Sequence, residues 1–83
     1  MKKIYAICTT LDAGCNSDRK DILASGMVVG DKIELRNAEV GTWYTNVYLV
    51  GYEKSFNSVF FKFVDENGEK YDIYNDKDFQ TYW

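Results

Sequence analysis

The sequence contains no histidine and no proline, and only two cysteines among its 83 residues. Without histidine, the chain lacks the side chain that most often serves as general base, neutral metal ligand or switch near neutral pH. The spacing of Cys8 and Cys15 fits neither a CxxC redox pair nor a zinc pattern, and it leaves open whether the two form a disulfide. The sequence therefore predicts no catalytic residues, no metal site and no cofactor.

Long apolar segments and an excess of basic residues are also lacking. No stretch approaches the length of a membrane-spanning helix, and Asp12 interrupts the first apolar run too early for a signal peptide. The formal net charge is −3, and the acidic excess lies after Gly51. We therefore expect a cytoplasmic protein with reduced thiols that inserts in no membrane. We do not expect it to bind nucleic acid, because it would neutralise few phosphates.

Alternation of apolar and polar residues dominates the rest of the chain and predicts short strands. Five strands are expected, over Lys2–Thr9, Lys32–Arg36, Tyr44–Glu53, Ser58–Asp65 and Lys70–Asn75. Asn67 and Gly68 tolerate positive φ and predict a hairpin turn before the last strand. One short helix is expected over Ser17–Ser25, between a capping Ser17 or Asp18 and a terminating Gly26. Such a short helix requires Ile22 and Leu23 to dock on other elements.

These elements predict a single domain over residues 1–83, mainly β and at the margin of the α+β class. Two architectures fit the order of elements: a small SH3-like antiparallel barrel, or a strongly bent five-stranded sheet with the helix on one face. The barrel is favoured because the strand expected over Tyr44–Glu53 is long, and Gly51 could bend it to serve both halves of a barrel.

The aromatic content exceeds what a small core readily holds, with seven tyrosines, five phenylalanines and two tryptophans. Alternation places Leu49, Phe61, Phe63 and Ile73 together in the core. It leaves other aromatic residues on the opposite faces of their strands, among them Tyr44, Tyr48, Tyr52, Phe60 and Tyr74. One interpretation is that the helix and the C-terminal Phe79 and Trp83 cover this second face. The other is that Trp43, Tyr44, Tyr48 and Phe60 form an exposed patch that binds a partner.

The stretch "YTNVYLVGYEKSFNSVFFKF", followed by "YDIYND" and a terminal aromatic segment, resembles small uncharacterised proteins encoded by phages and prophages of Gram-positive bacteria. The similarity covers the last half of the chain and is one of general pattern, so no functional residue is carried over from it. It implies a small intracellular accessory protein made during infection, which binds a host protein or a nucleotide signal and could inhibit host defence.

The sequence supports two functional hypotheses of different classes. The first is a non-enzymatic interaction module that binds a host protein or associates with itself through the aromatic patch. The alternative is a protein that binds a small ligand or nucleotide, with tyrosines stacked on a base and lysine or arginine on phosphate.

Overall fold

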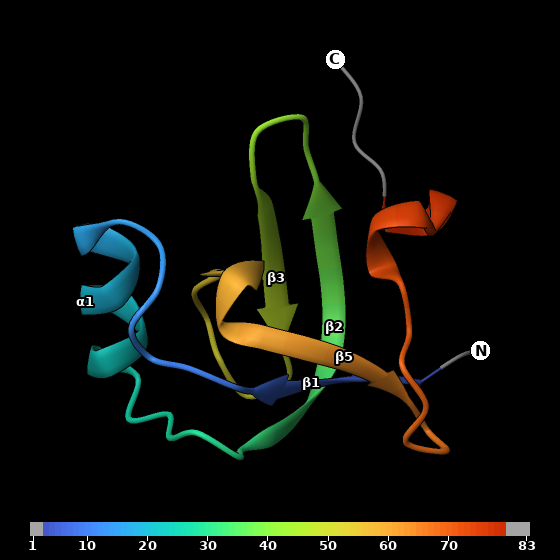
Figure 1. The fold of residues 1–83 in the computed structure, drawn as a ribbon, viewed down its shortest axis with the longest axis horizontal. Helices are drawn as coiled ribbons and strands as arrows, with labels where there is room; N and C mark the ends of the chain where they lie inside the picture. The colour runs from blue at the N-terminus through green and yellow to red at the C-terminus, as the bar shows by residue number, and fades with distance from the viewer. Residues whose placement is uncertain (1–2, 80–83) are drawn as a thin grey trace.

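The computed structural model of the protein describes residues 3–79, which form one bent antiparallel sheet and a single α-helix (Figure 1). The elements are β1 (Ile4–Cys8), α1 (Asn16–Ala24), β2 (Lys32–Val40), β3 (Thr45–Leu49), β4 (Phe56–Asn57), η1 (Ser58–Phe60), β5 (Phe61–Asp65), η2 (Ile73–Asn75) and η3 (Lys77–Phe79), where η marks a 3₁₀ helix. The strand order is β4-β3-β2-β1-β5, and all four strand pairs are antiparallel. The predicted fold class, a mainly β five-stranded antiparallel sheet with one short helix, is confirmed.

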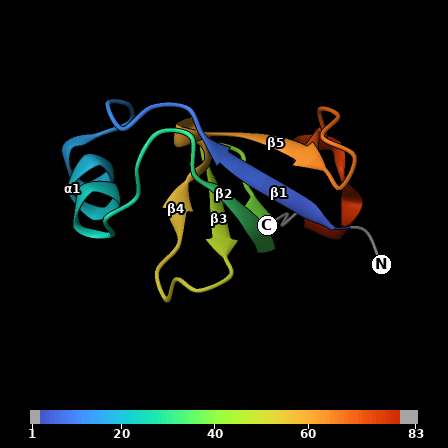
Figure 2. The same ribbon diagram turned by 90° about the horizontal axis from the view of Figure 1, so that it is seen from below.

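Strand β2 bends the sheet by serving both of its halves. Its first residues pair with β1, with Glu34 opposite Tyr5, and its later residues pair with β3 as far as Val40. Near the start of the ladder with β3, between Leu35 and Asn37, the register shifts by one residue at Arg36, as it does at a β-bulge. The pair β1–β5 consequently crosses the group of β2, β3 and β4 (Figures 1 and 2). The expectation that Gly51 would bend the long strand was wrong. Gly51 has φ +91° and lies in the turn that follows β3.

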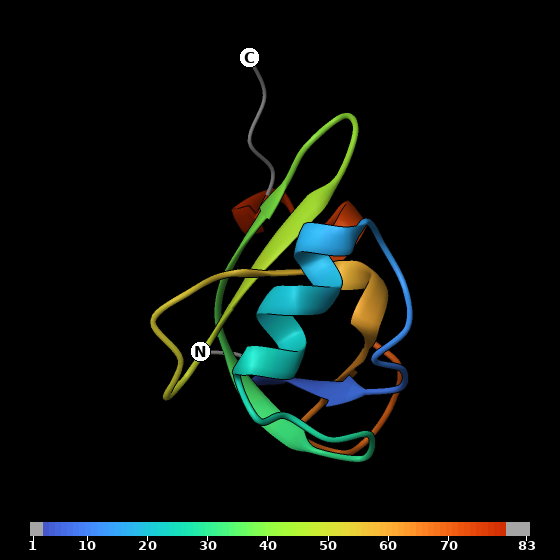
Figure 3. The same ribbon diagram turned by 90° about the vertical axis from the view of Figure 1, so that its left-hand side faces the viewer.

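The sheet is open, so of the two predicted architectures the bent sheet is the correct one and the favoured barrel is not formed. The edge strands β4 and β5 do not pair with each other. Helix α1 packs against β4, on the side of the molecule that faces the viewer in Figure 3. The Asn57 amide of β4 donates a hydrogen bond of 3.1 Å to Asp18 of the helix. The chain after β5 turns at Gly68 and pairs with β5 at a single bridge, between Val64 and Lys70.

Helix α1 begins at Asn16, one residue before the expected start, and its N-cap residue is Cys15 instead of Ser17 or Asp18. The Asp18 carboxylate accepts hydrogen bonds from the Cys15 main-chain N–H and from the Cys15 thiol. Burial on its own would raise the pKa of Asp18, but the hydrogen bonds from Cys15 and Asn57 lower it below the ordinary 3.8. Gly26 has the predicted positive φ beyond the helix. Ile22 is buried as expected, whereas Leu23, which was expected to dock with it, is 61% exposed.

The core lies inside the bend and includes the four residues predicted to share it. Leu49, Phe61, Phe63 and Ile73 are all buried in one apolar cluster. Phe79 packs against this cluster, as expected for the C-terminal segment, while Trp83 and Lys2 lie outside the described residues.

Phe60 also belongs to the core, which corrects its assignment to an exposed patch. Its side chain is 0% exposed and its ring meets that of Phe61 edge to face. The reason is the 3₁₀ turn η1, which Asn57 caps by accepting a hydrogen bond from the Val59 N–H at 3.1 Å. Alternation applies only to extended chain, so residues 60 and 61 both face inward where the turn meets β5.

The last predicted strand, Lys70–Asn75, was wrong beyond its first residue. Asp72 accepts a hydrogen bond of 3.0 Å from the Tyr74 N–H and another from the Asn75 amide, and the chain enters η2. Local bonding of an aspartate to the main chain competes with strand pairing in this way.

We expect Phe60→Ala to lower the free energy of unfolding by about 3–5 kcal/mol, because it removes a buried ring and leaves a cavity. The neighbouring Val59→Ala is the matched control, since Val59 is 48% exposed and should change stability little. Urea denaturation of both variants measures the difference. A loss below about 1 kcal/mol for Phe60→Ala would contradict the placement of this ring in the core.

Candidate partner-binding surface

The hairpin that joins β2 to β3 carries the most exposed aromatic residues described. A main-chain hydrogen bond of 3.1 Å from the Gly41 N–H to the Tyr44 carbonyl closes its turn. Trp43 is 92% exposed and Tyr44 is 62% exposed. In Figure 1 this hairpin tip projects beyond the rest of the sheet. The two rings are therefore outside the core, as the patch hypothesis predicted for them.

Two hollows flank the hairpin tip, and Trp43 and Tyr44 line both. The smaller, about 130 Å³, also includes Glu39 and Asn46 on the outer face of the hairpin. The larger, about 290 Å³, lies between the tip and the 3₁₀ turns η1 and η2, and Val59 and Tyr74 line its far side. Both of these residues are close to half exposed. Trp43, Tyr44, Val59 and Tyr74 are called the aromatic surface below.

Tyr74 is fixed at the junction of this surface and the core. Its hydroxyl donates a hydrogen bond of 3.0 Å to the Ser58 hydroxyl, and its ring lies edge-on to that of Phe63, with 6.5 Å between centroids. Sequence reasoning left Tyr74 unassigned and did not single out Val59. The signals that place them are the capping residues Asn57 and Asp72, which start the two 3₁₀ turns.

Tyr48 lies further along the outer face of β3 and interacts within the chain. It is partly buried, its hydroxyl donates a hydrogen bond to the Glu39 carboxylate, and the Arg36 guanidinium lies 5.4 Å from the ring centroid. The hydrogen bond to Glu39 and, next, burial raise the pKa of Tyr48 above its ordinary value of 10.0. Of the four residues predicted to bind a partner, the structure thus brings Trp43 and Tyr44 together, links Tyr48 to them through Glu39, and buries Phe60.

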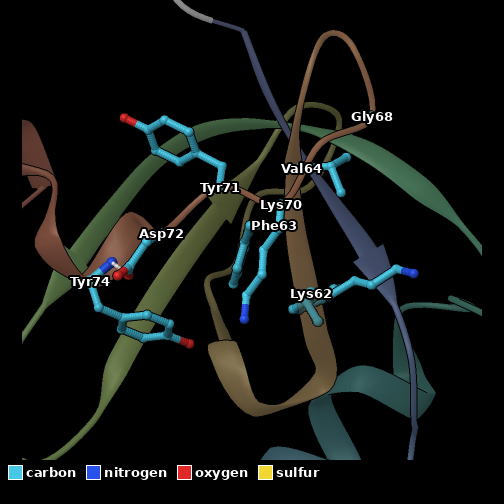
Figure 4. A pocket seen from close by; sticks show the side chains of 9 residues that line it. Lys62, Phe63, Val64, Gly68, Lys70, Tyr71, Asp72 and Tyr74 are labelled. Carbon is cyan, nitrogen blue, oxygen red and sulfur yellow. Dashed lines mark hydrogen bonds between the residues drawn. The ribbon is translucent and has the colours of Figure 1, made fainter.

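A groove of about 800 Å³ lies between β5 and the chain that returns beside it, and it reaches Tyr74 (Figure 4). It is called the β5 groove below. In Figure 4 the side chains of Phe63, Lys70 and Tyr74 converge on this space, and Lys62 leaves β5 on the side away from Tyr74. Tyr71 and Asp72 complete the wall. Tyr74 lines both this groove and the larger hollow.

The family of the protein is shown by comparison with known proteins. A model of the family described as Bacteriophage T4 protein Y07B matches residues 3–83. The chain belongs to this family. The resemblance to phage proteins is confirmed to that extent, although bacteriophage T4 infects the Gram-negative Escherichia coli and the Gram-positive origin is not supported. No curated protein and no solved structure matches the chain.

Three further features of this Y07B-family chain bear on its chemistry. Within residues 3–79, no set of three or more histidine, cysteine, aspartate or glutamate side chains is arranged to hold a metal ion. No helix in the same range is long and apolar enough to cross a membrane. Cys8 and Cys15 are free thiols, and burial raises the pKa of Cys8 above 9.0. The raised pKa makes the Cys8 thiol a poor nucleophile near neutral pH.

Titration of Tyr48 tests the geometry of the outer face. Because its pKa is raised in the folded protein, the stabilisation it provides is complete below pH 10.0 and is lost as the pH rises through the folded-state pKa. We expect Glu39→Gln to shift the tyrosinate titration of Tyr48 to lower pH, and Tyr48→Phe to remove this part of the alkaline loss of stability.

Ultraviolet titration and denaturation at several alkaline pH values measure these two effects. Glu69→Gln, in the exposed turn after β5, is the control and should leave both curves unchanged. Identical tyrosinate curves for wild type and Glu39→Gln would contradict the hydrogen bond between Tyr48 and Glu39.

Proposed function

We propose that this phage protein is a non-enzymatic interaction module that binds a protein of the infected cell, in its cytoplasm, through the aromatic surface. One observation carries the proposal: Trp43 and Tyr44 project from the tip of the β2–β3 hairpin, and both side chains are largely exposed. The main-chain hydrogen bond from Gly41 to Tyr44 holds the turn that carries them. Tryptophan and tyrosine supply large contact areas at little cost in conformational entropy, and they are enriched among the residues that dominate binding energy.

The shape of the surface supports a protein as the partner. The rings stand beside a hollow whose opposite side is lined by Val59 and Tyr74, so a partner side chain could insert between two partly apolar walls. Exposed apolar patches with polar surroundings are typical of protein interaction sites. Inhibition of a host defence protein would be one use of such a module in a phage.

Two other occupants are to be distinguished from a host protein. A second copy of the chain could cover the aromatic surface. A small ligand or nucleotide remains the alternative function, because tyrosines and lysines meet in the β5 groove, where Lys70 and Tyr74 line the same space. Stacking of a base on tyrosine and pairing of phosphate with lysine would be its recognition chemistry.

We expect the double substitution Trp43→Ala with Tyr44→Ser to weaken binding of the host partner by about 2 kcal/mol or more, because it removes the two exposed anchors. Thermal stability should stay close to wild type, since both rings are largely exposed. The partner is captured from host lysate, identified by mass spectrometry, purified and titrated calorimetrically. Leu23→Ala is the matched control, because Leu23 is an apolar residue on α1 that is exposed to the same extent as Tyr44.

The outcomes separate the candidates. Unchanged affinity of a folded double variant for the captured protein would refute the proposed surface. Concentration-dependent light scattering of wild type that disappears in the double variant would assign the surface to self-association. A rise in melting temperature with nucleotides alone would favour the ligand-binding alternative.

A further inference from the structure

We infer that the smaller hollow at the tip of the β2–β3 hairpin binds an arginine side chain of the protein partner, against the rings of Trp43 and Tyr44 and beside the carboxylate of Glu39. This inference rests on the proposed function and names the residue by which the partner is recognised. The volume of the hollow is about 130 Å³, which is below the roughly 300–1,000 Å³ of sites that enclose a whole small molecule. The hollow therefore suits the end of one side chain.

The register of the hairpin brings the carboxylate and the aromatic rings to one face. Glu39 pairs with Asn46 across the two strands, and opposite residues of an antiparallel pair have their side chains next to each other. Thr45 and Val47 are buried, so the alternating Tyr44 and Asn46 lie on the outer face. The hollow thus combines a carboxylate and an amide with the two exposed rings.

Glu39 gives this hollow a negative charge that the protein itself does not neutralise. Among the described residues that line the two hollows at the hairpin tip, Glu39 is the only charged one. Its Oε1 atom accepts the hydrogen bond from the Tyr48 hydroxyl, and no lysine or arginine within residues 3–79 forms an ion pair with it. A carboxylate offers about four acceptor positions on its two oxygens. Glu39 therefore retains acceptors for an incoming cation.

Arginine fits this set of groups better than lysine does. Its planar guanidinium can stack on an aromatic ring while its N–H groups donate to carboxylate and amide oxygens. A contact of the same kind already occurs within the hairpin, where the Arg36 guanidinium lies 5.4 Å from the centroid of the Tyr48 ring. At the hairpin tip the rings and the carboxylate are present, and the cation is the missing component.

The arginines of this chain are engaged elsewhere, which favours a different protein over a second copy. The chain has two, Arg19 and Arg36. Arg36 lies over Tyr48, and Arg19 donates hydrogen bonds to the Gly14 carbonyl at 3.0 Å and to the Asn16 side chain. A second copy would have to give up one of these contacts to fill the hollow. The net charge of −3 also favours a partner with a basic surface.

The experiment starts from a displayed library of random linear peptides, selected against the full 83-residue protein. We expect the selected peptides whose binding is lost in Trp43→Ala to share an arginine. Replacement of that arginine by citrulline, which has nearly the same shape but no charge, should weaken binding about tenfold. The reason is that the cation–π contact and the charge-assisted hydrogen bonds are lost together.

Glu39→Gln identifies the group that meets the arginine. This substitution should weaken the arginine peptide about tenfold and change the binding of the citrulline peptide little, because only the charged side chain loses its counter-ion. A structural effect of the substitution would weaken both peptides equally. Glu69→Gln removes the same charge in the exposed turn after β5 and should bind both peptides as wild type does.

A pair of substitutions at Tyr44 separates the cation–π contact from apolar packing. Tyr44→Phe keeps an aromatic ring and should bind the arginine peptide as wild type does. Tyr44→Leu should bind it several-fold more weakly, since an aliphatic side chain has no π face for the cation. Equal affinities of these two variants would overturn the inference, as would an equal loss of both peptides in Glu39→Gln.

The selected peptides also distinguish failure of this inference from failure of the proposed function. Peptides that depend on Trp43 but need no arginine, or that need lysine in its place, overturn the inference and leave the proposed function standing. Binders indifferent to Trp43→Ala, or a library without binders, overturn the inference as well. The affinity of the captured host protein for the double variant then decides the proposed function separately.

Discussion

The fold depends on β2, the one strand that pairs with both parts of the sheet. Lys32–Glu34 pair with β1, and the residues from Leu35 to Val40 pair with β3 across a one-residue register shift at Arg36, so one strand turns the sheet around its own core. Bulges increase local bending and twist without ending a strand. The bent sheet wraps around its core without forming a closed barrel. Even this small domain therefore buries Leu49 and Phe63 in one cluster. The same bend directs the β2–β3 hairpin tip past η1 and η2, which creates the hollow beside Trp43.

Two capping side chains decide which aromatic residues face solvent. Asn57 starts η1 and Asp72 starts η2, each by accepting a hydrogen bond from the main-chain N–H two residues later. The first turn directs Phe60 inward and Val59 outward, and the second leaves Tyr74 across the hollow from Tyr44. The aromatic surface is thus composed of a hairpin and two turns, elements whose side-chain directions depend on local hydrogen bonds instead of strand alternation.

The chain beyond β5 connects the sheet to the aromatic surface. It pairs with β5 at the bridge of Val64 with Lys70, donates a hydrogen bond from the Tyr71 N–H to the Phe63 carbonyl, and then departs to place Tyr74 against Phe63.

The sequence by itself determined the fold class, the helix position, and the burial of Leu49, Phe61, Phe63 and Ile73, because apolar periodicity and glycine at turns are local signals. It also indicated that Trp43 and Tyr44 exceed the needs of the core. Only the tertiary structure decided that the sheet stays open, that β2 and not the strand ending near Gly51 provides the bend, and that Phe60 is internal. These features depend on register between strands distant in sequence and on caps that compete with extended chain, and neither is encoded in the alternation of residues along one strand.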